Sequence, residues 1–122
     1  MAEVQQLCDT HDLVLLQEHW LLPNELQLLS GIHVDFFATG SSAVDNGSDI
    51  LIGRPYGGTA ILYRKTLAGH ISLVQTDESR LTGITISTRH GPTLILNVYM
   101  PTDYHDDDSM ENMLIFVVKL TR

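Results

Sequence analysis

Two short apolar runs, each carrying a reactive side chain at its end, most constrain how this chain of 122 residues folds. Residues 13–18 read Leu-Val-Leu-Leu-Gln-Glu, and residues 94–101 read Leu-Ile-Leu-Asn-Val-Tyr-Met-Pro. Runs of this length between polar turns are typical of strands that are buried on both faces, because covering layers on each side remove the need for alternation. Both runs therefore predict buried strands of a layered α/β protein.

The polar groups at the ends of these runs are the first candidates for function. Layered α/β proteins place catalytic groups at strand ends, where the strand is rigid and the adjoining loops leave room for substrate. Glu18 closes the first run, and Tyr99 lies near the end of the second. A carboxylate and a phenol placed at strand ends suggest a metal-assisted site.

Further strands and one surface loop are expected from apolar runs and turn residues. The strands are expected at residues 34–39, 58–64, 71–76, 83–88 and 93–99. Residues 89–92 read Arg-His-Gly-Pro and predict a hairpin with a four-residue loop. Residues 40–49 are polar and rich in turn formers, which indicates a surface loop.

Three helices are expected between and after these strands. A short helix at residues 3–8 would turn Val4, Leu7 and Cys8 inward. A second helix would begin at Pro23 and end at Gly31. A third is expected at residues 110–120, because residue 108 is Asp and residue 111 is Glu, the spacing of a capping box.

Composition limits the class of protein and its partners. The formal charge is −8 and the few basic residues are scattered, so a basic surface for nucleic acid is not predicted, although an acidic surface can surround a divalent metal. No apolar stretch approaches the roughly 20 residues of a membrane span and the N-terminus lacks signal-peptide features, so we expect an intracellular protein, nuclear or cytoplasmic, without a membrane partner. The single cysteine, Cys8, has no disulfide partner in the chain and is expected to be buried.

Four segments, in order, carry a resemblance to a known family. They are the Gln-Glu strand end at residues 17–18, Gly-Gly-Thr-Ala-Ile-Leu at residues 57–62, Arg80 before a strand, and Asn-Val-Tyr-Met-Pro at residues 97–101. Together they resemble the endonuclease/exonuclease/phosphatase superfamily. The resemblance implies a two-sheet α/β sandwich, with Glu18 as a ligand of catalytic Mg²⁺ and Tyr99 in contact with the scissile phosphate of the substrate. It also implies that Glu18 and Tyr99 lie at the same edge of one sheet, on neighbouring strand ends.

Within that superfamily, Gln-Glu-His-Trp-Leu at residues 17–21, followed by a Leu-rich helix, is most similar to one branch. That branch is the apurinic-endonuclease-like domain of LINE-type non-LTR retrotransposons, which nicks target DNA. Phosphoinositide phosphatases and other phospholipid-cleaving members share the same strand ends, and a non-catalytic remnant or interaction protein is a third hypothesis. All three hypotheses stay open at this point.

The resemblance covers only part of the family's pattern. The opening strand with its Asn, the Asp-x-Asn pair and the terminal Asp-His pair have no counterpart in the sequence. We therefore expect residues 1–122 to form a truncated domain, a partial sandwich that is inactive by itself and aggregates through uncovered sheet edges. Asn97 is expected on the same strand face as Tyr99, His19 and His105 on the surface, and the acidic run at residues 103–108 in a solvated loop rather than a metal site.

Overall fold

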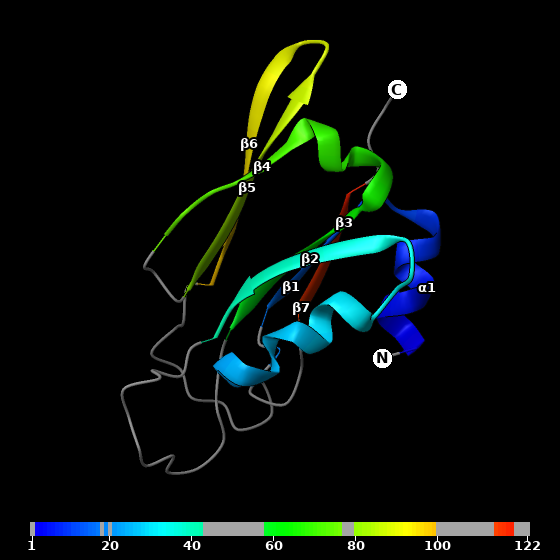
Figure 1. Ribbon diagram of the computed structural model, residues 1–122, viewed down its shortest axis with the longest axis vertical. Helices are drawn as coiled ribbons and strands as arrows, with labels where there is room; N and C mark the ends of the chain where they lie inside the picture. Colours follow the sequence, from blue (N-terminus) through cyan, green and yellow to red (C-terminus); the bar gives the residue numbers. More distant parts are fainter. Residues whose placement is uncertain are drawn as a thin grey trace.

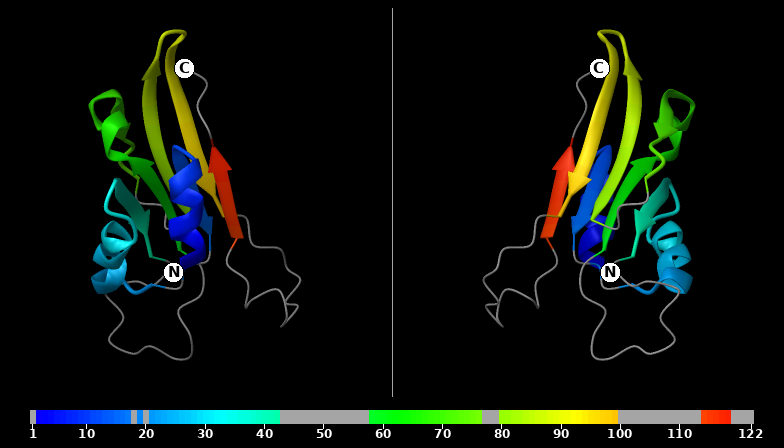
Figure 2. Two further views of the ribbon diagram at one scale, coloured as in Figure 1. Left: turned by 90° about the vertical axis from the view of Figure 1, so that its right-hand side faces the viewer. Right: turned by 90° about the vertical axis from the view of Figure 1, so that its left-hand side faces the viewer.

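The computed structural model describes residues 2–17, 19, 21–42, 58–76, 80–99 and 114–118. These residues form a layer of helices, a four-stranded sheet and a three-stranded sheet (Figures 1 and 2). The predicted fold class, a two-sheet α/β sandwich, is confirmed for this part of the chain. No helix in these ranges is long and apolar enough to cross a membrane.

The first sheet is built around the first apolar run. Its strands are β1 (Leu13–Gln17), β2 (Phe36–Ser41), β3 (Thr59–Arg64) and β7 (Leu114–Val118), in the order β2-β3-β1-β7. Every neighbouring pair is antiparallel. All five residues of β1 are buried, so the prediction for this run is confirmed.

Helices cover one face of the first sheet. They are α1 (Ala2–Thr10) and the 3₁₀ helix η1 (Pro23–Gly31), and a second 3₁₀ helix, η2 (Lys65–His70), follows β3. Val4 and Cys8 of α1 are buried and Leu7 packs beside them, as predicted. The predicted limits of η1 are also confirmed, although it winds more tightly than an α-helix.

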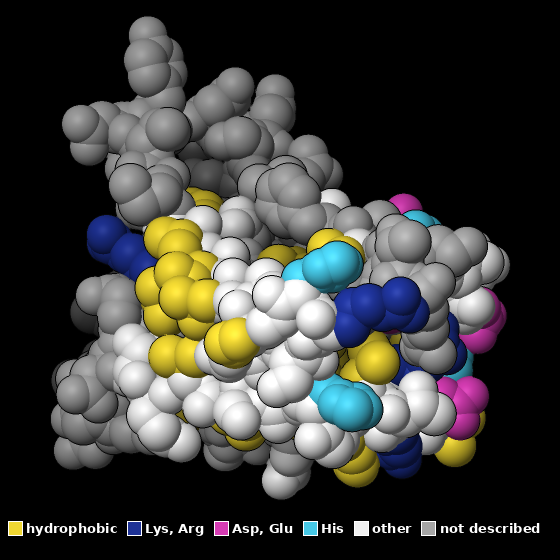
Figure 3. Space-filling model, turned by 90° about the horizontal axis from the view of Figure 1, so that it is seen from above, with side chains coloured by type: hydrophobic (Ala, Val, Ile, Leu, Met, Phe, Trp, Pro, Cys, Tyr) yellow, Lys and Arg dark blue, Asp and Glu magenta, His cyan; other side chains and the backbone are white. Residues whose placement is uncertain are grey.

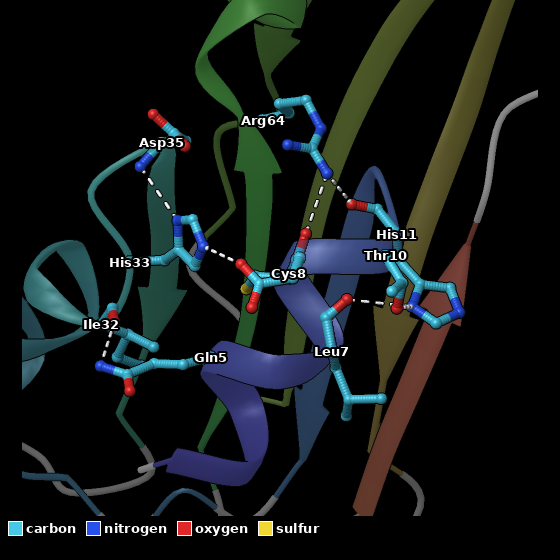
Figure 4. A network of polar contacts seen from close by, with 10 residues as sticks. Gln5, Leu7, Cys8, Thr10, His11, Ile32, His33, Asp35 and Arg64 are labelled. Carbon is cyan, nitrogen blue, oxygen red and sulfur yellow. Dashed lines mark hydrogen bonds and ion pairs between the residues drawn. The ribbon is translucent and has the colours of Figure 1, made fainter.

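Arg64 of β3 and its neighbours fasten α1 to the first sheet (Figure 4). The guanidinium donates to the carbonyl oxygens of Cys8 at 2.9 Å and His11 at 2.6 Å, and its Nε lies 3.3 Å from Asp12 Oδ1. The last turn of α1 has no basic residue of its own, so Arg64 supplies the positive charge that a helix C-terminus favours. A pair between His33 and Asp9 ties the same helix to the segment before β2.

The second sheet packs on the other face of the first. It contains β4 (Ile71–Leu73), β5 (Leu81–Thr88) and β6 (Gly91–Val98), in the order β4-β5-β6. Thr88 pairs with Gly91, so the β5–β6 hairpin has a two-residue loop, and the predicted four-residue loop is wrong. Gly91 has φ of +107°, a left-handed conformation that lets β6 begin two residues earlier than expected.

The second apolar run is not buried on both faces, and this prediction is wrong. The exposed fractions of Leu94, Leu96 and Val98 in β6 are 57%, 45% and 39%. Only alternate residues of this strand face the first sheet, and no described element covers its other side. Figure 3 shows hydrophobic side chains gathered on one flank of the molecule.

The predicted helix at residues 110–120 is also wrong where the structure describes it. Residues 114–118 form strand β7, which pairs with β1 from Leu13↔Val118 to Gln17↔Leu114. The sequence of this segment, Leu-Ile-Phe-Val-Val, is rich in the aromatic and β-branched residues that fit a pleated sheet. The hydrogen bonds to buried strand β1 stabilise the extended conformation of this segment more than the upstream helix-cap pattern stabilises a helix. The cap pattern depends only on neighbouring residues, whereas the strand pairing depends on the tertiary structure.

Candidate functional site

Polar residues occupy matched positions at one end of both sheets. In the first sheet, Gln17 pairs with Thr59, which in turn pairs with Ser41. In the second sheet, Thr82 pairs with Asn97. Four of these five side chains are buried, Ser41 being the exception, although every other buried residue of β1, β3 and β5 is apolar or a glycine. Because uncompensated polar burial destabilises a fold, such a row needs hydrogen-bond partners.

Gln17 and Asn97 satisfy each other across the two sheets. Gln17 Nε2 donates to Asn97 Oδ1 at 2.8 Å and to the Val98 carbonyl oxygen at 2.9 Å. Asn97 Nδ2 donates to the carbonyl oxygens of Leu16 at 2.9 Å and Ala60 at 3.0 Å. We call these four bonds the amide clasp. It brings the end of β1 against the end of β6.

A row of hydroxyl groups lies beside the amide clasp. Thr59 Oγ1 is 2.6 Å from Thr82 Oγ1 and 3.2 Å from Ser41 Oγ. The Thr82 hydroxyl also donates to the Thr59 carbonyl oxygen at 3.0 Å. This hydroxyl row therefore links the two sheets a second time, through β3 and β5.

His19 is buried, and the expectation that it lies on the surface is wrong. Its exposed fraction is 7%. Nδ1 accepts the Leu21 backbone N–H at 2.9 Å, which leaves the proton on Nε2 to be donated to the Ser41 carbonyl oxygen at 2.8 Å. Burial lowers the pKa of His19 below its ordinary value of 6.5, while hydrogen bonds to the backbone of Ser41 and Thr59 oppose that shift. The imidazole ring is thus neutral, and its two nitrogens are both hydrogen-bonded. These bonds connect the segment after β1 to the first sheet.

Gly58 makes room for this histidine. Its φ is +91°, and a Cβ at this position would lie only 2.3 Å from His19 Cε1. Residue 58 must therefore be glycine for both conformational and steric reasons. Gly58 of the Gly-Gly segment therefore has a local structural role.

Tyr99 follows β6 directly and reaches the same end of the molecule as the amide clasp. Its N–H donates to the Arg80 carbonyl oxygen at 2.8 Å, and its side chain is half-buried. Arg80 precedes β5 and is exposed. This bond extends the β5–β6 pairing by one step beyond the strands, so the position of the Tyr99 backbone is fixed by the second sheet.

Glu18 lies outside the described residues, as do His105 and the acidic run at residues 103–108. Both sequence neighbours of Glu18 are anchored: Gln17 to β6 and His19 to β2. The expectation that Glu18 and Tyr99 follow neighbouring strands of one sheet is wrong, because β1 and β6 belong to different sheets. The two strand ends meet face to face across the layers instead.

A comparison with known protein families shows to which family the chain belongs. The family model described as endonuclease/exonuclease/phosphatase family matches residues 1–120. The chain belongs to the endonuclease/exonuclease/phosphatase family. No curated protein and no solved structure matches it. Membership in this family supports a phosphodiesterase or nuclease type of protein, and its members are typically metal-dependent.

The donor atoms at this end suit a hard cation such as Mg²⁺, which prefers oxygen ligands. Gln17 Oε1 accepts no hydrogen bond from the described part of the chain, although the residue is only 8% exposed. Both nitrogens of His19 are engaged, so this ring offers no ligand. No group of three or more His, Cys, Asp or Glu side chains that could hold a metal occurs among the described residues.

Local sequence patterns do not predict the contacts between the two sheets at this end. The amide clasp, the hydroxyl row and the burial of His19 were not predicted. The available signal was a polar residue at the end of each apolar strand, at Gln17, Thr59 and Asn97. Which of these residues pair across the layers depends on sheet stacking, which a local pattern does not encode.

Proposed function

We propose that this chain is part of a Mg²⁺-dependent phosphodiesterase that cleaves DNA, of the retrotransposon endonuclease type. Glu18 holds the metal, and Tyr99 binds the phosphate of the substrate. The observation that carries the proposal is the amide clasp, whose bonds bring the end of the Gln-Glu strand to the end of the Asn-x-Tyr strand. Two residues that are 80 positions apart in sequence, Gln17 and Asn97, are thereby in direct contact.

The chain's own residues have distinct tasks in this proposal. The Glu18 carboxylate provides a negatively charged oxygen ligand, and the Tyr99 hydroxyl donates a hydrogen bond to a phosphate oxygen. When bound, Mg²⁺ supplies charge stabilisation for a phosphodiester that is being cleaved. Gln17, Asn97 and His19 hold the flanking backbone in place.

These residues do not make a complete hydrolytic site. Such a site also needs a positioned water and a general base, and the sequence has no Asp-x-Asn or Asp-His pair to provide them. Removing one group of this kind commonly lowers a rate about a hundredfold or more. We propose that the 122 residues alone bind Mg²⁺ weakly and do not cleave DNA.

Plasmid nicking tests this proposal. The purified chain is incubated with supercoiled or apurinic plasmid and Mg²⁺, beside Glu18→Ala, and conversion to the nicked form is measured on a gel. We expect no metal-dependent nicking by either protein. Mg²⁺-dependent cleavage that disappears in Glu18→Ala would instead show a self-sufficient enzyme.

Metal binding and the genomic reading frame test the remaining parts. Loss of the free Mn²⁺ signal in electron paramagnetic resonance should occur at millimolar metal and should be reduced in Glu18→Gln. Equal binding by both proteins would remove Glu18 from the site. Downstream codons for the Asp-x-Asn and Asp-His pairs, followed by a reverse transcriptase, would support the DNA substrate, whereas a frame for a phospholipid-cleaving enzyme would overturn it.

A further inference from the structure

The two candidate groups follow strands of different sheets, so their separation depends on how the sheets are stacked. No backbone-to-backbone ladder joins β1 to β6 in the described residues. The apolar contact between the layers is formed by buried side chains, with partly buried hydrophobic side chains packed against them. The buried ones are Leu13, Leu15, Ile61 and Ile84. Apolar packing is non-directional, so it leaves the two layers less constrained against sliding than hydrogen bonds do.

The amide clasp adds directional bonds between the ends of β1 and β6, beside the Thr59–Thr82 bonds of the hydroxyl row. Each of its two side chains donates to the backbone of the opposite sheet: Gln17 to the Val98 carbonyl, and Asn97 to those of Leu16 and Ala60. Val98 immediately precedes Tyr99, and Gln17 immediately precedes Glu18. The bonds therefore act next to the two candidate groups.

We propose that Gln17 and Asn97 are positioning residues, whose reciprocal amide bonds fix the backbone before Glu18 against the backbone before Tyr99. The proposal rests on the proposed function, because it gives Glu18 and Tyr99 their roles. It adds the element that joins them, which is a pair of buried amides and not a strand pairing.

Core filling alone does not account for this pair. Gln17 lies at the end of a strand whose other four residues are apolar and buried, and a leucine there would fill space without needing partners. Local rules of this kind are broken most often at functional sites. His19 repeats the pattern on the other side of Glu18, with its bond to Ser41 in β2, so residue 18 is bracketed by two buried and bonded side chains.

Apolar replacement of both amides separates positioning from stability. Exchanging both partners of a buried hydrogen bond for apolar groups of similar shape can leave stability nearly unchanged, and this applies to the Gln17–Asn97 bond. The test variant is therefore Gln17→Met with Asn97→Leu. The carbonyl oxygens of Leu16, Ala60 and Val98 each lose a donor in the same variant, so its free energy of unfolding is measured beside that of the parent. The matched control is Thr82→Val, which removes another buried bond between the sheets at the same end but does not flank Glu18 or Tyr99.

Distances between paired spin labels measure the stacking directly and without metal. In a Cys8→Ala background, one pair of labels is placed at Gln27 of η1 and Val98 of β6, the strand that contains Asn97. A second pair is placed at Gln6 of α1 and Ser87 of β5. We expect narrow distance distributions for both pairs in the parent and in Thr82→Val. The double variant should broaden the Gln27–Val98 distribution at least twofold and leave the second pair unchanged.

Two results would overturn the proposal: an unchanged Gln27–Val98 distribution in the double variant, or an equal broadening in Thr82→Val. Should the double variant not fold, Gln17→Met alone provides the same measurement, since Asn97 then keeps its bonds to Leu16 and Ala60. We expect an intermediate broadening for that single variant, and the parent distribution would overturn the proposal.

Paramagnetic broadening then connects the clasp to the site. With ¹³C-labelled tyrosine rings, Mn²⁺ should broaden Tyr99 more than Tyr63 in the parent chain. In the double variant the Tyr99-selective effect should fall several-fold at equal bound Mn²⁺, and its retention would overturn the proposal. If Glu18→Gln leaves the effect unchanged, the metal-ligand role of Glu18 is wrong, and the spin-label distances still decide the clasp.

Discussion

Strands β1 and β6 come from sequence runs that look alike, yet the structure treats them differently. All five residues of β1 are buried between helices on one face and the second sheet on the other. In β6, Asn97 is the only buried residue, and three of the apolar side chains are more than a third exposed. The two strands are alike only near their ends, where the buried amide side chains of Gln17 and Asn97 form a hydrogen bond.

The difference shows what an apolar run encodes. A run of leucines and isoleucines specifies a strand, but its burial depends on how many layers the rest of the chain places around it. β1 lies between β3 and β7 and has a layer on each side. β6 ends the described order of the second sheet and has one layer. Near their ends both strands contain a buried amide side chain, Gln17 in β1 and Asn97 in β6.

Truncating one leucine in each strand should give the largest contrast. Leu16 in β1 is fully buried, so Leu16→Ala should lower the free energy of unfolding by about 2–5 kcal/mol. Leu94 in β6 is 57% exposed, so Leu94→Ala should cost less than about 1 kcal/mol. Urea unfolding followed by circular dichroism measures both. Equal losses would mean that β6 is covered as fully as β1.

Much of the first sheet was predictable, because strong local signals agree with the tertiary structure there. The apolar runs predicted β1 and β3, and Pro23 and Gly31 predicted the limits of η1. The terminal strand β7 was not predicted, because a capping pattern upstream favoured a helix and only pairing with β1 overrides it. In the site, the amide clasp was not predicted, since it joins residues that are close only after the two sheets stack.

Replacing glycine with alanine should destabilise the protein more at Gly58, beside the candidate site, than at Gly91, in the β5–β6 hairpin. Gly58 and Gly91 both have positive φ, so alanine should cost each about 1–2 kcal/mol in backbone conformation. At Gly91 no atom lies within 4 Å of the added Cβ, whereas at Gly58 the His19 ring lies 2.3 Å away. Overpacking should add about 1–3 kcal/mol for Gly58→Ala. Similar losses in thermal unfolding for both variants would show that His19 does not pack against Gly58.

Cys8 beneath β1 should make the stability of the buried side depend on alkaline pH. Burial, with a smaller contribution from Asp9 and partial opposition by Arg64, raises the pKa of its thiol from 9.0 to about 11. The folded state therefore holds this proton more tightly than the unfolded state, so the stabilisation is full below pH 9 and lost as pH rises toward 11. The loss should be on the order of 2 kcal/mol by that pH.

The matched variant for this pH dependence is Cys8→Ala, which has no thiol to ionise. The free energy of unfolding of the two proteins, measured from pH 8 to pH 11, should converge as pH rises. Parallel curves would contradict the burial of the thiol. No comparable effect is expected from β6, which contains no titratable side chain.

Polar replacement on the exposed side of β6 should have the smallest effect on stability and a clear effect on association. Leu94 and Val98 point away from the first sheet and form part of an apolar face that no described element covers. Changing both to Thr keeps a residue that suits a strand, so the free energy of unfolding should move by no more than about 0.5–1 kcal/mol. Exposed apolar faces and strand edges favour aggregation, so the variant should show a larger monomer fraction in sedimentation velocity. The control is Ile84→Thr on the inward side of β5, which should lower the free energy of unfolding and increase aggregation. If both variants lower it equally, the two sides of the second sheet are equally buried, and β6 is covered like β1.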